Sequence, residues 1–474
     1  MSHCPPVSLR VTMQSMTDCV FPQGVPRERT PMKKLSIRPV LTATAAACLL
    51  PAVAVAQTTL QSPPGGMLGE SAAQPAGQSA ATPMTTDMTV PMTVPMSPAQ
   101  AMSQPYSPVS SNADQREGFH FRGMAGVERD SNVLRTATGQ ISDTITGLGL
   151  GLRYQKRISQ QQIVVDAEVD RYHYDKISAG FTAFNYSAAW NFKLGERIDG
   201  IASADRRQFR DVTSNGVANG INRRTERNEL FEGGYKLGAG WRVLAGLQHQ
   251  ASRSTDPTAW DANLSETSGR VGTSYEFASG STLALRYRHG NGDYSNSPII
   301  TGFNDDEIEG TMHWVVSPKT TVDARLAHLR RDHDGANAGA FNFSGLTGSA
   351  GINWAITGKT SLAAGYTRDL ASYVFGTGGH LESDRWYIGP TWRATELITV
   401  NLRYEHENRK FVNITGSGDV GRRDKFDVAN LGVDWAIRRT INLGAQYRYE
   451  KRSSSLPAFN YRANVIGLTA RLTI

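Results

Sequence analysis

Fifteen arginine, aspartate and glutamate side chains occupy the polar positions of runs in which apolar and polar residues alternate. In a strand, successive side chains point to opposite faces, so the charges of each run share one face. Opposite charges on a wall around water set a transverse field and select solutes by charge and hydrogen bonding. These candidate lumen-lining residues are Arg153, Asp166, Glu168, Asp170, Arg270, Arg286, Arg288, Glu309, Arg325, Arg393, Arg403, Glu405, Arg448, Glu450 and Arg471.

Three tyrosines fall on the same polar face, namely Tyr172, Tyr174 and Tyr387. Aromatic rings and planar guanidinium groups can contact sugar rings and hydroxyls, so a sugar polymer is one solute that such a wall suits. The alternative is that arginines and carboxylates on neighbouring strands neutralise one another and keep the wall rigid. We expect this structural role for most of the charged residues.

Signatures of an enzyme are weak. Residues 416–421 satisfy G-x-G-x-x-G, but they lie in a polar stretch with no helical period after it. The acidic stretches 304–309 and 330–335 offer oxygen ligands for a divalent cation, although we expect both to be solvated outer loops. A hydrolase with a site at the barrel rim would need a serine beside His173, His289 or His406, and no motif places one there. We predict no catalytic residue, no metal and no cofactor.

The elements that position the charges are long alternating strands. Apolar residues occupy every second position in stretches such as 184–194, 308–316, 398–404, 441–449 and 466–474. Runs of about ten residues that end at turns are typical of a transmembrane β-barrel. A soluble β-sandwich also alternates, but its strands are shorter and its polar faces meet bulk water. Here the polar face carries mainly small and neutral residues with single charges, which favours a curved wall around water.

Connections between these runs alternate in length. Tight ones such as "KLGERID" and "AITGKTS" separate long polar ones at 211–227, 288–307, 368–385 and 407–425. Short turns at one end and long loops at the other are typical of outer-membrane barrels. We predict an antiparallel up-and-down barrel of about 18 strands over residues 116–474, with both termini at the short-turn end. Aromatic residues near the run ends predict an interfacial girdle: Trp190, Phe192, Trp241, Tyr275, Phe277, Trp314, Trp354, Trp392 and Trp435.

The stretch "TITGLGLGLRYQKR" places three leucines on one face of a strand and Gly147, Gly149 and Gly151 on the other. We expect the leucines to meet lipid. Two interpretations of the glycines remain open. They keep the inner wall thin where a solute or an inward-folded loop passes, or they relieve the curvature of the barrel.

The first 115 residues predict export and a linker. Residues 32–56 combine a basic start, an apolar stretch and a small-residue cleavage signal, as a secretory signal peptide does. A lipoprotein signal using Cys48 is the weaker alternative, and residues 1–31 are expected to be an upstream extension. Residues 57–115 are rich in Pro, Met, Ser and Ala, so we predict a disordered periplasmic linker rather than a methionine-rich metal tether.

Composition limits the class of protein. The mean hydropathy of -0.38 and the absence of a stretch of roughly 20 apolar residues exclude a helical membrane protein. All three cysteines precede residue 57, so the exported chain has no disulfide. The net charge is +7, but the first 56 residues hold six basic and two acidic side chains, which leaves +3 for the rest. This small excess argues against a nucleic-acid partner.

Two stretches resemble a known family. "GVERDSNVLR" carries a D-x-N-x-x-R pattern at Asp130, Asn132 and Arg135, and the chain closes with "YRYEKRSSSLPAFNYRANVIGLTARLTI". Both are similar to the EpsL-like group of outer-membrane β-barrel porins encoded with exopolysaccharide biosynthesis clusters. The resemblance covers residues 116–474, with its specific motifs at the two ends. One departure is Ile474, because outer-membrane barrels commonly end in Phe or Trp.

The resemblance implies a non-enzymatic channel in the Gram-negative outer membrane that takes part in exopolysaccharide biosynthesis or export. Its expected partners are outer-membrane lipid and lipopolysaccharide, exopolysaccharide, other export components and the barrel assembly machinery. Two alternatives remain open, an outer-membrane hydrolase with a rim site and a closed barrel that scaffolds other envelope proteins.

Overall fold

The computed structural model describes residues 117–474 except 212–221, 256–262 and 296, and it contains one antiparallel sheet of 18 strands. The predicted leader and linker lie outside the described residues. The strands of the first half are β1 (Gly118–Asp130), β2 (Asp143–Ile158), β3 (Gln161–Tyr174), β4 (Phe181–Leu194), β5 (Ile198–Asp211), β6 (Asn222–Gly238), β7 (Trp241–Ser254), β8 (Leu264–Glu276) and β9 (Thr282–Tyr294). Those of the second half are β10 (Ile300–Ser317), β11 (Thr320–Gly335), β12 (Phe343–Trp354), β13 (Thr360–Ser372), β14 (Gly378–Arg393), β15 (Ile398–Thr415), β16 (Arg423–Arg438), β17 (Ile441–Ser454) and β18 (Tyr461–Thr473).

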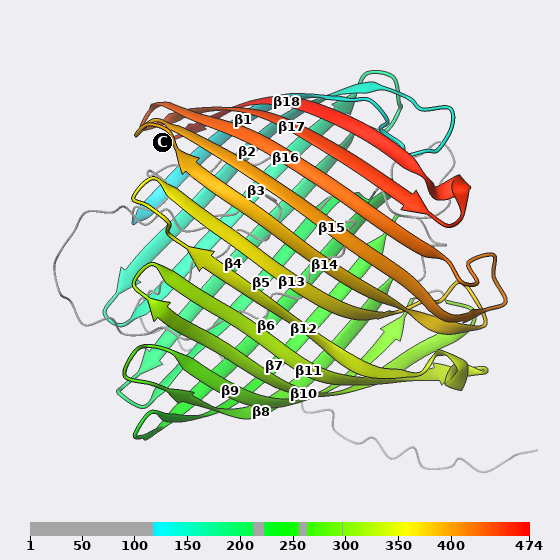
Figure 1. Ribbon diagram of the computed structural model, residues 1–474. Coiled ribbons are helices and arrows are strands. Elements are labelled where there is room, and N and C mark those ends of the chain that lie inside the picture. Colours follow the sequence, from blue (N-terminus) through cyan, green and yellow to red (C-terminus); the bar gives the residue numbers. More distant parts are fainter. Residues whose placement is uncertain (1–116, 212–221, 256–262, 296) are drawn as a thin grey trace, which may run out of the picture. The chain divides into compact units, whose positions relative to one another are not determined.

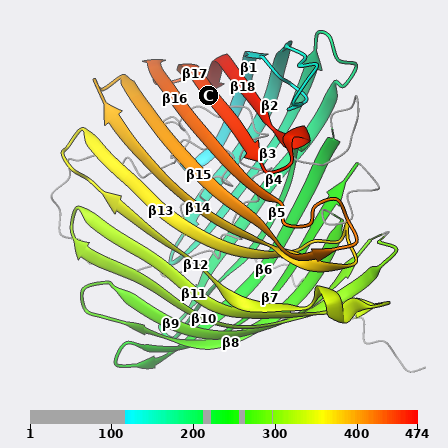
Figure 2. The ribbon, with the colours of Figure 1, turned by 45° about the vertical axis from the view of Figure 1, so that its right-hand side comes forward.

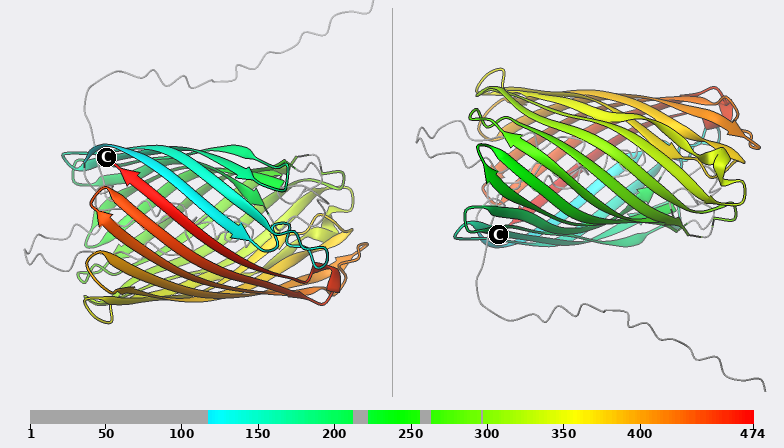
Figure 3. Two further views of the ribbon diagram at one scale, coloured as in Figure 1. Left: turned by 90° about the horizontal axis from the view of Figure 1, so that it is seen from above. Right: turned by 90° about the horizontal axis from the view of Figure 1, so that it is seen from below.

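Each strand pairs with its neighbours in sequence, and β1 also pairs with β18, so the sheet closes into an up-and-down barrel (Figures 1 and 2). The closing seam runs from the pair Arg122 and Thr473 to the pair Asp130 and Val465. Figure 3 shows the cyan β1 lying beside the red β18 along this seam. Closure removes the open edge that an isolated sheet would present. The prediction of about 18 antiparallel strands is confirmed.

The outer face of the barrel is apolar. Leu148, Leu150 and Leu152 of β2 are 58%, 74% and 37% exposed, as a strand facing lipid requires. Near the short turns, four of the predicted aromatic residues form a chain of ring contacts. The ring of Tyr275 lies 5.0 Å from Trp241 and 4.8 Å from Phe277, which in turn lies 5.4 Å from Trp314.

The two ends of the barrel differ as predicted, but the longer loops are shorter than the sequence indicated. At the short-turn end two residues join β2 to β3, β6 to β7, β10 to β11 and β16 to β17. At the other end, three of the predicted long connections are mostly strand. The loops that remain are 295–299 within the predicted 288–307, 373–377 within 368–385, and 416–422 within 407–425. Beyond the apolar band these strands continue with a mainly polar outward face and an inward face that mixes charged residues with buried apolar ones such as Ile300 and Phe303. The apolar-out, polar-in alternation of the lipid-facing part is therefore lost, although the hydrogen bonds between the strands continue.

Buried apolar side chains gather on the inner side near this long-loop end. One cluster joins Val133 of the β1–β2 loop to Ile145, Tyr174, Phe181 and Ala183. A second joins Tyr294, Ile300 and Phe303 to Phe341 and Val374. Phe341 belongs to the short helix η3 (Ala338–Phe341), and Val374 to the β13–β14 loop. These loops therefore fold onto the inner face of the strands. Within the described residues, no helix has the length and apolar character needed to cross a membrane.

Candidate functional site

The structure places all fifteen charged residues from the sequence prediction on the inward face of the barrel. Each lies at the alternate positions from the exposed apolar side chains of its own strand, and each is buried or half-buried. Period-two alternation thus separates these residues from the outward apolar ones. The alternation did not indicate which of these residues form ion pairs with one another. In the structure the ion pairs divide them into separate groups.

The largest group is a charge ladder of five arginines and five carboxylates on β6 and β8–β11. It joins five residues of the sequence prediction to five that the prediction missed. Its members are Glu232, Glu266, Arg270, Arg286, Arg288, Asp305, Glu307, Glu309, Arg325 and Arg331.

Carboxylates of β10 form the centre of the ladder. Arg325 of β11 reaches Glu307 and Glu309 at 2.5 Å each. On the other side of β10, Arg288 lies 3.2 Å from Glu307 and Arg286 lies 3.4 Å from Glu309. Each carboxylate is thus held from both neighbouring strands.

The ladder extends beyond β10 in both directions. Glu232 of β6 forms ion pairs with Arg270 at 2.8 Å and with Arg286 at 3.4 Å. Asp305 forms an ion pair with Arg331 at 2.7 Å, and Arg288 also contacts Glu266. Five positive and five negative side chains make the ladder neutral, so it supplies oriented local fields without a net charge.

A second inward group, on β1–β3, contains more acid than base. Arg122 lies 2.5 Å from Asp166 and 3.4 Å from Glu168, and Arg153 lies 3.7 Å from Asp166. Asp170 is the next inward residue of β3 after Glu168, and it accepts a hydrogen bond from the side-chain amide of Asn185 at 3.3 Å. Arg122 was missed by the sequence prediction, although its alternation within β1 places it on the same face.

The glycines of β2 make room for this group. A Cβ atom on Gly151 would lie 3.1 Å from Nε and Nη2 of Arg122, and one on Gly149 would meet Oδ1 of Asp170. The guanidinium of Arg122 on β1 therefore crosses β2 over a glycine to reach Asp166 on β3. Gly151 thus leaves space for the long Arg122 side chain to lie across the strand. This role differs from both predicted ones, which were to thin the wall for a passing solute or loop and to relieve the curvature of the barrel.

The same arrangement recurs on the inner wall. Arg242 of β7 crosses Gly234 of β6 to reach Asp199 of β5 at 2.9 Å, and a Cβ on that glycine would lie 2.7 Å from Cδ of the arginine. Arg270 of β8 crosses Gly246 of β7 on its way to the ladder, where the corresponding distance to Nε is 3.1 Å. Inward glycines thus let arginines lie along the wall instead of pointing toward the barrel axis.

A third inward group lies on β14 and β15. Glu405 pairs with Arg403 at 3.3 Å and with Arg385 at 3.7 Å. The Arg403 guanidinium also lies 3.8 Å from the ring centroid of Tyr387, a cation–π contact. Tyr387 is therefore half-buried beneath a charged group, whereas Tyr172 and Tyr174 pack in or against the apolar cluster around Val133.

Three further predicted residues behave differently. Arg448 contacts Glu450 at 2.7 Å. Arg471 is buried on β18 near the closing seam. Arg393 lies at the short-turn end of β14, where it forms no ion pair with any described residue.

The D-x-N-x-x-R stretch builds a buried clasp across the closing seam, formed by Asp130, Asn132, Arg135 and Glu450. Arg135 has φ of 53° and donates to both oxygens of Asp130, at 2.9 and 2.7 Å, and to Glu450 of β17 at 2.6 Å. Asn132 donates to the carbonyl oxygen of Arg462 on β18 at 3.1 Å. The clasp therefore ties the first strand to the last two.

Electrostatics favour the charged form of Arg135. Burial by itself lowers the pKa of this guanidinium, but the carboxylates of Glu450 and Asp130 outweigh burial and hold the pKa well above its ordinary value. The three side chains are at most 1% exposed. Arg135 is thus a permanent charge in the clasp.

The three histidines considered for a hydrolase face outward. His289 contacts Asp306 at 2.9 Å and His406 contacts Asp427 at 2.8 Å, while His173 is largely exposed. No hydrogen bond joins any of the three to a serine among the described residues.

Sequence reasoning missed one buried serine–histidine pair. Nε2 of His333 lies 2.8 Å from Oγ of Ser372, which also accepts from Arg331 at 3.2 Å. The other imidazole nitrogen has no partner among the described residues, so no third group orients the ring. Both side chains are less than 8% exposed, which gives a substrate no access. This geometry supports a packing role rather than catalysis.

The two acidic stretches are strands, not solvated loops, and this part of the prediction was wrong. Residues 304–309 belong to β10, where Asp305 and Glu307 face the ladder and Asp306 faces outward. Residues 330–335 belong to β11, where alternation likewise separates Asp332 from His333. Across the described ranges no three potential metal ligands converge. The G-x-G-x-x-G match lies in the β15–β16 loop.

Comparison with known proteins gives the following similarities. Residues 317–474, the last third of the chain, match the family described as "Putative beta-barrel porin 2". Comparison with curated proteins gave no match. Among solved structures, the outer-membrane protein opdK from Pseudomonas aeruginosa is 12% identical with a TM-score of 0.43, covering 75% of this chain and 99% of its own.

Two other solved structures give similar values. OccAB3 from Acinetobacter baumannii is 10% identical with a TM-score of 0.43, over 75% of this chain and 98% of its own. OprD from Pseudomonas aeruginosa is 10% identical with a TM-score of 0.40, over 77% and 98% of the two chains. The family match over residues 317–474 makes the last third of this chain similar to a family of barrel-forming porins.

Proposed function

We propose that the protein is an outer-membrane channel whose solute passes along the charged inner wall of the barrel. The observation that carries this proposal is the contrast between the two faces of one closed sheet. Leucines and aromatic residues cover the outside, whereas the inside carries the charge ladder and two further ionic groups. A lipid-facing exterior around a polar interior is the arrangement of porins.

The ionic interior favours a hydrated channel over a closed scaffold. Charged side chains in a dry interior lose their hydration, and ion pairs repay that loss only partly. A barrel that served only as a scaffold would be filled more stably by apolar side chains. Arg122, Asp166 and Arg403 keep 13%, 18% and 20% of their side-chain surface exposed, as groups beside water do.

We further propose exopolysaccharide as the solute, on the basis of the sequence resemblance at Asp130–Arg135 and at the C-terminal strand. The wall is compatible with a sugar polymer because the Arg403–Tyr387 stack offers a planar cation over an aromatic ring. The neutral ladder provides many hydrogen-bonding groups without holding a polyanion or polycation tightly.

The proposed location follows from the same features. The short turns would lie in the periplasm and the longer loops outside the cell, with the predicted leader directing export. Lipid and lipopolysaccharide would surround the barrel, and the assembly machinery and other export components would be its protein partners.

Single-channel conductance tests the proposal. Purified protein is inserted into a planar bilayer, and current is recorded with and without the polysaccharide of the producing strain. Discrete conductance steps that the polysaccharide blocks are the expected result. Insertion without conductance would refute the open lumen, and steps unaffected by polysaccharide would refute the solute while keeping the channel.

A further inference from the structure

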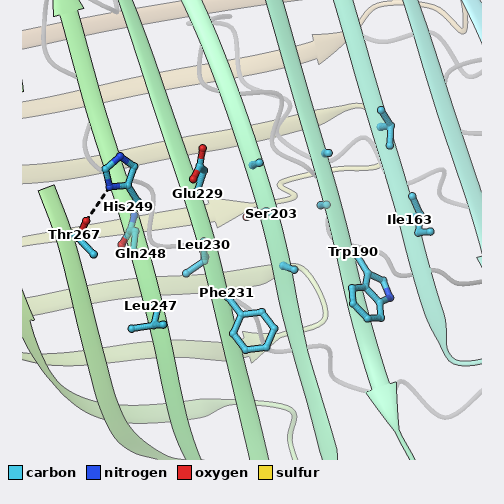
Figure 4. Close-up of a pocket in the computed structure, with 15 residues that line it drawn as sticks. Ile163, Trp190, Ser203, Glu229, Leu230, Phe231, Leu247, Gln248, His249 and Thr267 are labelled. Atoms are coloured by element: carbon cyan, nitrogen blue, oxygen red, sulfur yellow. Dashed lines mark hydrogen bonds between the residues drawn. The ribbon is translucent and has the colours of Figure 1, made fainter. Parts of the chain in front are cut away.

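An apolar hollow of about 580 Å³ lies on the outer face of β4–β7, away from the charged inner wall. Its floor consists of Ala188, Ala202 and Ala204, whose side chains end at Cβ. Trp190 and Phe231 border it toward the short turns, where they are 42% and 51% exposed (Figure 4). Three small side chains between large ones therefore leave a depression in a surface that otherwise faces lipid.

The opposite end of the hollow is polar. Glu229 of β6 lies directly across from His249 of β7, and His249 contacts Thr267 of β8 at 2.9 Å. Figure 4 shows these three side chains at the end away from Trp190 and Phe231. One end of the hollow thus suits hydrocarbon and the other suits a hydrated group.

Two arginines stand just beyond this polar end. Arg206 of β5 and Arg227 of β6 are direct cross-strand partners. They form the next pair on the outward face, two residues along each strand from the pair Ala204 and Glu229. Like charges directly opposite on one face repel each other and destabilise a sheet. Arg206 donates to the carbonyl oxygen of Phe184, but neither guanidinium forms an ion pair with a described residue.

The depth of this pair matches a membrane boundary. Arg206 lies eight residues above the start of β5, and Arg227 lies eleven residues above the end of β6. With a rise of about 3.3 Å per residue and a tilt of about 40°, Arg206 is roughly 20 Å above the turn at the start of β5 and Arg227 roughly 28 Å above the turn at the end of β6, which reaches further down. The apolar band of such a barrel is about 25 Å tall, so the pair lies at its upper edge.

We propose that the hollow binds one phosphate-bearing lipid of the leaflet at the long-loop end. An acyl chain lies over Ala188, Ala202 and Ala204, and a headgroup phosphate bridges the Arg206 and Arg227 guanidinium groups. Phosphate suits this position because guanidinium binds it through paired hydrogen bonds, and its charge cancels the repulsion of the two arginines. The other ionisable groups facing the site are Tyr186, Glu229 and His249, of which Tyr186 of β4 is the cross-strand partner of Arg206. Glu229 repels the phosphate and thereby orients it toward the arginines.

The inference rests on the barrel lying in a bilayer and does not involve the lumen. It is tested by native mass spectrometry of the full chain in detergent, titrated with lipid A that carries its two phosphates. The expected result is one retained lipid per wild-type chain. The double variant R206Q/R227Q should need at least ten times more lipid A for half occupancy, since each charge-assisted hydrogen bond contributes strongly to binding.

Matched controls separate the parts of the proposal. K425Q/R462Q removes two outward positive charges from β16 and β18 and should bind like wild type. Dephosphorylated lipid A should bind wild-type protein as weakly as lipid A binds R206Q/R227Q. Ala204→Phe fills the hollow and should reduce retention while both arginines remain.

Several outcomes would overturn the assignment. Equal binding by R206Q/R227Q and wild type, or equal losses in K425Q/R462Q, would show that the pair forms no specific site. Equal binding of phosphorylated and dephosphorylated lipid A would exclude phosphate recognition. Conductance recorded on the same preparations should be unchanged by R206Q/R227Q, and its absence in wild type would refute the channel alone.

Discussion

Replacing Arg135 by methionine should strongly destabilise the barrel, because Arg135 is a buried cation in the β1–β2 loop. The substitution leaves Asp130 and Glu450 buried, each 0% exposed, without their shared cation. Removing one partner of a buried ion pair costs about 3–5 kcal/mol. Arg210 at 3.4 Å still contacts Asp130, and Arg448 at 2.7 Å still contacts Glu450, so we expect the lower end, about 3 kcal/mol.

The assay is urea unfolding of the barrel in lipid vesicles, followed by tryptophan fluorescence, with the heat-shifted gel band as a test of folding. The control is Arg462→Met, an exposed outward arginine whose loss should change the free energy of unfolding by less than about 0.5 kcal/mol. If Arg135→Met lowered the free energy of unfolding by less than about 1 kcal/mol, the clasp would be refuted. Arg210 and Arg448 would then be sufficient to compensate the buried carboxylates without Arg135.

The pKa of Arg135 adds a condition to this prediction. A group whose pKa is raised on folding contributes stability that is present below its unfolded pKa and is lost only as pH rises through the folded value. The pKa of this guanidinium in the unfolded chain is already strongly alkaline, and its pKa in the folded barrel is raised well above that. The effect of Arg135→Met should therefore be the same at neutral and at moderately alkaline pH, and a strong dependence there would assign the effect to another group.

Three further predictions concern the two faces of the wall. E232Q/E309Q removes two carboxylates from the neutral ladder and should shift the reversal potential in a salt gradient toward anion selectivity; an unchanged potential would place the ladder away from the ion path. Gly149→Ala places a Cβ against Asp170 and should cost about 1–3 kcal/mol, whereas Gly123→Ala, with no atom within 4 Å, should be nearly neutral. Leu150→Arg puts a charge in lipid and should cost about 2–4 kcal/mol in vesicles, and a neutral result would show that this face does not contact the bilayer.

The strands and the two faces could be predicted because period-two alternation is a local property of an extended chain. Leu150 and Gly149 have opposite environments in the structure for the same reason that they alternate in the sequence. The ends of β9, β10 and β15 nearest the long loops were interpreted as loops because their outward face is mainly polar there. Their inward face mixes ionic residues with apolar ones such as Phe303 and Phe411, so the simple alternation of a lipid-facing strand is absent.

The pairing of inward charges could not be predicted, since it depends on the stagger between strands. Glu232 on β6 and Arg286 on β9 are separated by two strands, yet they lie 3.4 Å apart. Nothing in either local sequence encodes that offset. Asp305 and Glu307 were likewise assigned to a loop, whereas in β10 Asp305 lies opposite Arg331 and Glu307 lies within ion-pair distance of Arg325.

One signal of this pairing was nevertheless present in the sequence. Gly151, Gly234 and Gly246 stand at inward positions, where a Cβ atom would collide with an arginine from the next strand. An arginine that lies flat over a glycine reaches its carboxylate without pointing toward the barrel axis. The wall therefore carries these charges along its own surface. Inward glycines beside arginines thus indicate where ion pairs cross a strand in such a barrel, and in "TITGLGLGLRYQKR" this accounts for Gly151, whereas Gly149 makes room for Asp170.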